Sequence, residues 1–192
     1  EGRWERYESA PLGRTPIEVL YEDRDGNLWV GMVRGLARLQ AGRLRELVED
    51  DALGGAPRAI FEDREGSLWL GSQWEGLARL WNGWTRRYSR FEGLQDPILW
   101  SVARGPGGRL WAGTNNGLAV MRDGRFETVV AGKDLPHPNA YTLLPEEGVT
   151  WIGTRRGVAV LRGDRLETPP ELAPLRSAQV NGILRDRRGA LW

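Results

Sequence analysis

The sequence contains no cysteine and only one histidine, His137, among its 192 residues. This excludes disulfides, thiolate metal sites, cysteine nucleophiles and histidine-rich metal clusters, so no metal or cofactor is expected. Basic and acidic residues nearly balance, with 27 Lys and Arg against 26 Asp and Glu. Charge therefore gives no reason to expect nucleic acid or direct membrane insertion. No stretch approaches the ~20 consecutive apolar residues of a membrane span, and we expect a core-forming chain without a transmembrane helix or signal peptide.

Glycine and tryptophan are abundant, with 26 and 10 copies, and they recur at regular positions. A Gly-x-Leu/Thr-Trp motif ends at Trp29, Trp69, Trp111, Trp151 and Trp192, and the tryptophans are spaced by 40, 42, 40 and 41 residues. A glycine follows each of the first four tryptophans two residues later, and another glycine precedes a Leu-Ala or Val-Ala pair. A period of this length is typical of a repeat architecture.

Each repeat is predicted to form four short strands, because brief apolar runs alternate with glycine turns and no segment shows a helical stripe. Four antiparallel strands in a ~40-residue period are the signature of a propeller blade. The fold class is therefore all-β, a β-propeller treated as one domain over 1–192. We expect four complete blades and two partial ones, over 1–8 (partial), 17–48, 57–89, 99–130, 139–168 and 180–192 (partial).

The segment 23–31, Asp-Arg-Asp-Gly-Asn-Leu-Trp-Val-Gly, and the Gly35-Leu36-Ala37-Arg38 that follows resemble the two-component regulator propeller repeat. The segments 63–79 and 105–119 repeat the pattern, whereas 148–158 departs from it with Thr150 and Val158. The resemblance implies an extracytoplasmic or periplasmic sensor propeller of a bacterial receptor whose output module is a histidine kinase or a diguanylate cyclase. Such sensors carry more repeats, and no output module is present here, so we expect a fragment of a longer receptor.

The repeats amount to four to five blades, the lower end of the range for closed propellers, so the sequence allows either a closed or an open ring. The segment from Trp4 to Glu8 is one candidate for the outer strand of a fifth blade. An open ring would leave unpaired strand edges that favour a homo-oligomer.

A ligand is expected on the face formed by the loops between blades (D–A loops) and the middle hairpins of the blades (B–C loops). The D–A loops vary widely, and variation on a fixed scaffold is where specificity is usually placed. The opposite face carries short repeated turns in which Asp23, Asp63 and Asp186 precede tryptophan by six residues, and it is expected to be structural. The predicted ligand contacts are Arg34, Gln73, Trp74, Glu75, Trp100, Asn115, Asn116, Arg155 and Arg156, and they suit a carbohydrate or an organic anion.

We expect a binding protein and not an enzyme, with signal passing from the ligand to the output module. His137 lies between two prolines without a recognisable triad motif and is interpreted as a rigid loop residue. Two alternatives remain, a protein-interaction scaffold without a small ligand and, as a minority interpretation, a propeller lyase that opens streptogramin rings. Outside the repeat, Trp81 and Trp84 flank an Asn-Gly turn and are expected to pack as a cross-strand pair.

Overall fold

A computed structural model describes residues 15–40, 43–49, 53, 55–82 and 84–192. Within these residues the chain forms four antiparallel sheets of four strands, and each sheet keeps its strands in sequence order. The all-β propeller architecture predicted from the repeat is therefore confirmed. The partial blade predicted for 1–8, and its use in closing the ring, lie outside the described residues.

The four blades are built from sixteen strands in the described part of the chain, joined by hairpins within each blade. Blade 1 comprises β1 (Ile17–Glu22), β2 (Leu28–Met32), β3 (Gly35–Gln40) and β4 (Arg43–Glu49); blade 2 comprises β5 (Pro57–Glu62), β6 (Leu68–Ser72), β7 (Leu77–Trp81) and β8 (Trp84–Tyr88); blade 3 comprises β9 (Leu99–Arg104), β10 (Leu110–Thr114), β11 (Gly117–Arg122) and β12 (Arg125–Ala131); blade 4 comprises β13 (Ala140–Glu146), β14 (Val149–Thr154), β15 (Gly157–Arg162) and β16 (Arg165–Glu167).

The helices of the described part are all short 3-10 turns in loops. They are η1 (Arg90–Glu92), η2 (Pro106–Gly108), η3 (Gly132–Asp134) and η4 (Pro170–Leu175). Among the residues that the structure describes, no helix has the length and apolar character needed to cross a membrane.

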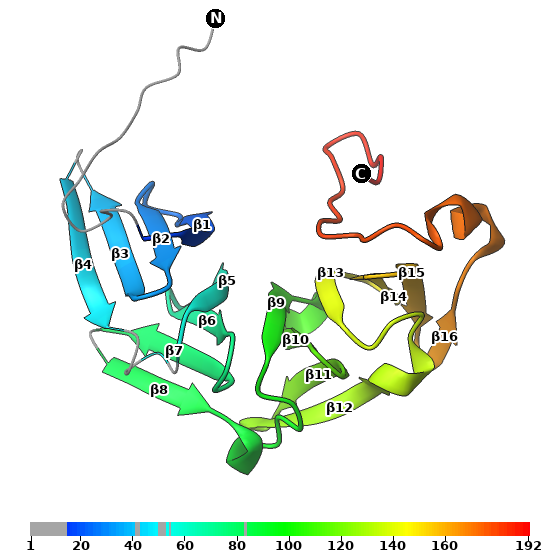
Figure 1. Cartoon of the computed structure of the whole chain (residues 1–192), viewed down its shortest axis with the longest axis horizontal. Coiled ribbons are helices and arrows are strands. Elements are labelled where there is room, and N and C mark those ends of the chain that lie inside the picture. The colour runs from blue at the N-terminus through cyan, green and yellow to red at the C-terminus, as the bar shows by residue number, and fades with distance from the viewer. Residues whose placement is uncertain (1–14, 41–42, 50–52, 54, 83) are drawn as a thin grey trace, which may run out of the picture.

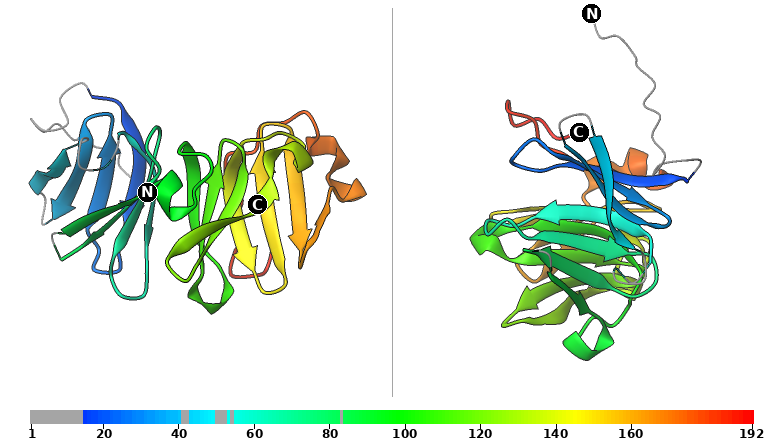
Figure 2. Two further views of the ribbon diagram at one scale, coloured as in Figure 1. Left: turned by 90° about the horizontal axis from the view of Figure 1, so that it is seen from below. Right: turned by 90° about the vertical axis from the view of Figure 1, so that its left-hand side faces the viewer.

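The blades lie side by side along an open arc, with the first strand of each blade toward the centre and the fourth at the periphery (Figure 1). A hairpin of the next repeat follows blade 4, held by a bridge between Arg185 and Leu191. The amide N of Val180 donates to the carbonyl O of Thr154 at 2.9 Å and docks this hairpin beside blade 4. From the side, the connecting loops gather on two opposite faces of the arc (Figure 2). These faces are the two loop faces distinguished in the sequence.

A glycine in the second strand of each blade lets the inner strand of the next blade approach closely. A Cβ atom on Gly31 would lie 2.9 Å from the Pro57 ring, and one on Gly71 would lie 3.1 Å from Leu99 Cβ. The equivalent Gly113 and Gly153 face Ala140 and Val180 in the same way. The glycine two residues after the tryptophan is thus required by blade-to-blade packing in these four blades.

In blades 1 and 2 the repeated tryptophan is anchored by the aspartate six residues earlier. The indole Nε1 of Trp29 donates to Asp23 Oδ2 at 2.8 Å, and Trp69 donates to Asp63 Oδ2 at the same distance. Asp23 also accepts the Asn27 amide at 2.8 Å, so one carboxylate fixes both the turn and the ring. Burial alone would raise the pKa of Asp23, but the hydrogen bonds from Trp29 and Asn27 outweigh it and hold that pKa below its usual value.

Blade 3 departs from this anchor, since Gly105 stands at the aspartate position. The Nε1 atom of Trp111 is buried and has no hydrogen-bond partner in the described structure. A Cβ atom on Gly105 would lie 3.1 Å from Pro145 Cβ and would also collide with the Trp111 ring. The ring therefore fills the space that a side chain at residue 105 would need.

Two surface features depart from an ordinary packed blade. Leu20 on the inner strand of blade 1 is 56% exposed, whereas its counterparts Ile60 and Leu143 are 8% and 7% exposed because a blade precedes them. Trp81 and Trp84 are directly opposite in the ladder, as expected. Trp84 is 71% exposed, however, so the expectation that both rings pack is wrong for Trp84.

Candidate functional site

A bulge near the start of each inner strand places one residue outside the regular ladder. In blade 1 the register with β2 shifts between Ile17 and Val19, which leaves Glu18 unpaired. The same shift occurs around Arg58, Trp100 and Tyr141 in the next three blades. A bulge bends the strand and re-aims the side chain of the extra residue. We call these four residues the bulge row.

The side chains of the bulge row contact one another from blade to blade. Arg58 Nη1 lies 2.8 Å from Glu18 Oε2, and the Arg58 guanidinium carbon lies 5.9 Å from the centroid of the Trp100 ring. The Trp100 and Tyr141 rings meet edge to face with centroids 4.8 Å apart. All four residues are half-buried. A line of polar and aromatic groups thus crosses the inner strands beside the D–A and B–C loops.

The structure brings two of the predicted ligand residues together at this row. Trp100 Nε1 donates to Asn115 Oδ1 at 3.3 Å, so the B–C loop of blade 3 touches the row. Asn116 is used differently, because its carbonyl accepts the Gly132 amide and fixes the start of η3. Trp100 and Asn115 are therefore the predicted residues that the geometry links to the centre of the arc.

The B–C loop of blade 2 has its own local contacts. Trp74 is 61% exposed, and its ring covers Gly55. Glu75 pairs with Arg87 at 2.7 Å between exposed side chains. The amide of Gln73 donates to the Ala56 carbonyl at 3.1 Å and ties the loop to the segment before β5. This loop presents an aromatic surface away from the contacts of the bulge row.

The predicted arginines lie on the loops of blades 1 and 4. Arg34, Arg155 and Arg156 are exposed. Arg156 lines a depression of about 380 Å³ together with Pro136, Leu172 and Arg176, among other residues. The structure therefore distributes the predicted ligand residues over several places on one face.

His137 has a structural contact in its loop, as its position between prolines suggested. Its Nδ1 accepts the amide of Asn139 at 3.3 Å. Burial and the charges of Arg155 and Arg156 lower the pKa of His137, so the neutral ring is favoured. Within the described residues no cluster of three or more His, Asp or Glu side chains is placed to hold a metal ion.

Sequence reasoning missed Glu18, Arg58 and Tyr141. These residues occupy the same repeat position as Trp100, directly after the residue that packs against the glycine of the preceding blade. The signal was present in the repeat, because polar or large residues recur there in an inner strand that is otherwise mostly apolar. Only the bulge shows why such residues are tolerated there.

The fold and the repeat define a β-propeller of four-stranded antiparallel blades. Residues 11–34 match the family described as two component regulator propeller. The chain therefore carries the two-component regulator propeller repeat, and the resemblance drawn from its sequence is confirmed. A search of the curated proteins found no match.

Solved structures share the fold at low sequence identity. The chain is 18% identical, with a TM-score of 0.81, to an extracellular domain assigned to a hybrid two component system, BT3049 of B. thetaiotaomicron; the match covers 98% of this chain and 28% of that one. Virginiamycin B lyase from Staphylococcus aureus is 16% identical with a TM-score of 0.70, over 94% of this chain and 64% of the lyase. A gluconolactonase from Xanthomonas campestris, XC5397, is 16% identical with a TM-score of 0.65, over 88% and 65% of the two chains. The chain thus spans less than two thirds of the length of each of these proteins.

Proposed function

We propose that this chain is the ligand-sensing propeller of a bacterial two-component or related signalling receptor, and that it is not an enzyme. The family match and the likeness to extracellular domains of two component systems support a signalling role and an extracytoplasmic location. The ligand binds on the D–A and B–C loop face, and its binding is passed to a kinase or cyclase output module. The observation that carries the proposal is the bulge row.

The chemistry of the row favours a hydroxylated ring that bears a carboxylate. Trp100 and Tyr141 offer aromatic surface for a ring to pack on. Arg58 has one nitrogen engaged by Glu18, and its buried Nε has no partner in the described structure. An unsatisfied buried donor favours a ligand oxygen that accepts from it. A sugar acid combines both features and falls within the expected classes, carbohydrate and organic anion.

Calorimetry with D-glucuronate tests this proposal, with glucose and acetate as probes of each half of the ligand. We expect glucuronate to bind more tightly than either. The substitutions Arg58→Gln and Trp100→Ala should each weaken its binding about tenfold, the loss expected for one charge-assisted hydrogen bond or one stacked ring. Arg109→Gln, an exposed arginine in the A–B turn of blade 3, is the matched control and should change nothing.

Two results would contradict ligand binding at the bulge row. Equal glucuronate affinity in the wild type, Arg58→Gln and Trp100→Ala would place binding elsewhere. A protein partner captured through Trp74 and Phe91, which are 61% and 86% exposed, would favour the scaffold alternative instead. Turnover of a streptogramin or a lactone by the purified chain would contradict the non-enzymatic role.

Self-association through blade 1 belongs to the same proposal. The exposed face of β1, with Ile17 at 51% and Leu20 at 56% exposure, is the surface that other blades bury against a neighbour. We propose that a second copy covers it. Light scattering across a concentration series should show a dimer or larger assembly that Leu20→Glu returns to monomer, and a monomer at every concentration would contradict this.

A further inference from the structure

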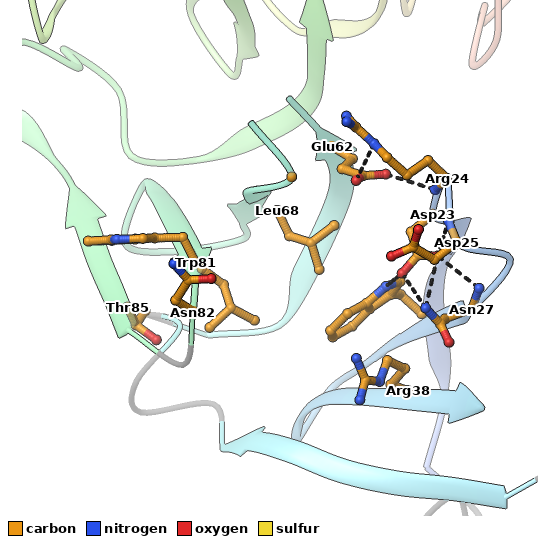
Figure 3. Close-up of a pocket in the computed structure, with 13 residues that line it drawn as sticks. Asp23, Arg24, Asp25, Asn27, Arg38, Glu62, Leu68, Trp81, Asn82 and Thr85 are labelled. Atoms are coloured by element: carbon orange, nitrogen blue, oxygen red, sulfur yellow. Dashed lines mark hydrogen bonds and ion pairs between the residues drawn. The ribbon is translucent and has the colours of Figure 1, made fainter. Parts of the chain in front are cut away.

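One departure from close blade packing lies between blades 1 and 2, on the face whose turns were expected to be structural. Here the structure has a groove of about 550 Å³ that runs between the A–B turn of blade 1 and the outer half of blade 2. This volume falls within the range of small-molecule sites. Figure 3 shows Arg24, Asp25 and Arg38 along one wall and Thr85 along the other, with Leu68 between them, while the Trp81 ring points away from the groove.

One side chain that borders the groove is smaller than its counterpart in blade 3. Between blades 2 and 3, Phe126 and Tyr88 fill the equivalent space, with ring centroids 6.2 Å apart, and Tyr88 lies 5.3 Å from the Trp69 ring. Phe126 pairs with Met121 and Thr85 pairs with Leu80, and both partners stand four residues after the repeated glycine of their blade, Gly117 and Gly76. Thr85 therefore occupies the phenylalanine position and leaves the space open.

The blade 2 side of the groove is apolar. Leu68, which is 5% exposed, and Leu80 form its floor beside Thr85. Trp81 borders the groove, but the Arg79 guanidinium carbon lies 5.3 Å from its ring centroid and 5.2 Å from that of Trp69. The Trp81 ring therefore lies on the Trp69 face of the blade, away from the groove. This half of the groove suits a flat apolar ring.

Two opposite charges on the blade 1 side have no ion-pair partner among the described residues. Arg38 contacts Gln40 Oε1 at 3.4 Å and is held over the Trp29 ring at 5.5 Å. The backbone N–H of Asp25 donates to Asp23 Oδ1 at 3.0 Å, and the Asp25 carboxylate has no partner within the described structure. The other charges are already occupied, because Arg24 Nε lies 2.7 Å from Glu62 and Asp23 accepts Trp29 and Asn27. The wall thus offers one cation and one anion.

We propose that this groove binds an aromatic amino acid. The ring packs against Leu68, Leu80 and Thr85, the carboxylate accepts from Arg38, and the ammonium group donates to Asp25. A zwitterion matches the pair of unused charges, whereas an aromatic acid or an aromatic amine would match only one of them. This site lies on the loop face opposite the bulge row and is independent of the sensor proposal.

Calorimetry with L-phenylalanine, phenylacetate and phenethylamine tests the assignment. We expect L-phenylalanine to bind with a Kd of about 1 mM or tighter. Thr85→Phe should abolish its binding while the melting temperature stays the same or rises, since the new ring fills the groove as Phe126 does in blade 3. Thr85→Ser, which keeps the groove open, and Arg109→Gln, in the A–B turn of another blade, should bind as the wild type does.

Phenylacetate and phenethylamine distinguish the contributions of Arg38 and Asp25. Arg38→Gln should weaken L-phenylalanine and phenylacetate about tenfold and leave phenethylamine unchanged, whereas Asp25→Asn should weaken L-phenylalanine and phenethylamine only. Failure of L-phenylalanine to bind in the millimolar range, or full binding by a folded Thr85→Phe protein, would overturn the proposal. Equal loss of all three probes in Arg38→Gln would also overturn it, because the arginine would then act only through packing.

Discussion

Substitution of Gly113 by alanine tests whether the blades meet as closely as the structure shows. A Cβ atom on Gly113 would lie 2.5 Å from the carbonyl O of Ala140, a contact with backbone that cannot swing aside. Real Cβ atoms essentially never approach below 3.0 Å, so blades 3 and 4 must separate by about half an ångström or more. Overpacking of this kind costs about 1–3 kcal/mol.

Calorimetric melting measures this effect. For a chain of this size each kcal/mol lowers Tm by about 2–4 °C, so Gly113→Ala should melt about 2–12 °C below the wild type. The control is Gly182→Ala, because a Cβ there meets nothing within 4 Å and its φ lies outside the left-handed region. It should be neutral or slightly stabilising. An unchanged Tm for Gly113→Ala would refute the close packing of blades 3 and 4.

Three further stability predictions use denaturant unfolding, and a fourth uses pH. Asp63→Ala leaves the buried Trp69 indole N–H without its acceptor and should cost about 1–3 kcal/mol. Phe126→Ala opens a cavity beside Tyr88 and should cost about 3–5 kcal/mol, whereas Trp84→Ser at an exposed position should change stability by less than about 0.5 kcal/mol. Because the pKa of Asp23 is lowered by folding, its stabilisation is present above the unfolded value of about 3.9 and is lost as the pH falls through the folded pKa. Asp23→Asn should therefore lose less stability than the wild type on acidification below about pH 4.

Three results would contradict these predictions. A loss for Trp84→Ser as large as that for Phe126→Ala would mean that the exposed ring is packed. Wild-type stability for Asp63→Ala would show that the indole finds another acceptor. Parallel acid profiles for the wild type and Asp23→Asn would show that the aspartate titrates normally.

The fold was predictable because its most constrained positions repeat in the sequence. Gly31 and Trp29 recur with constant spacing, and each has one physical reason, close approach for the glycine and filling with an anchored indole for the tryptophan. The packing of Trp84 was wrongly predicted, since adjacency in a hairpin does not tell whether a neighbouring blade covers the ring. An outer strand such as β8 leaves that side to solvent.

The candidate sites were less accessible to sequence reasoning. Trp100 and Asn115 were predicted from loop position, but Arg58 was missed because a bulge cannot be read from an alternating pattern. The groove is bordered by Thr85 in place of Phe126, a difference visible only when the repeats are compared at positions outside the conspicuous glycines and tryptophans. Candidate sites of this kind lie at positions where the residue differs from one repeat to the next, whereas the fold was predicted from positions where the residue is the same in each repeat.

The position of the bulge row separates residues that can vary from residues that hold the strands together. Each of its residues stands outside the ladder, so replacing Glu18, Arg58, Trp100 or Tyr141 leaves every strand pairing in register. The positions that specify the architecture and those that face the centre of the arc are therefore different residues of the same strand. Under the proposed function, one substitution per blade is enough to change the chemistry that a ligand meets at the bulge row while the blades stay the same.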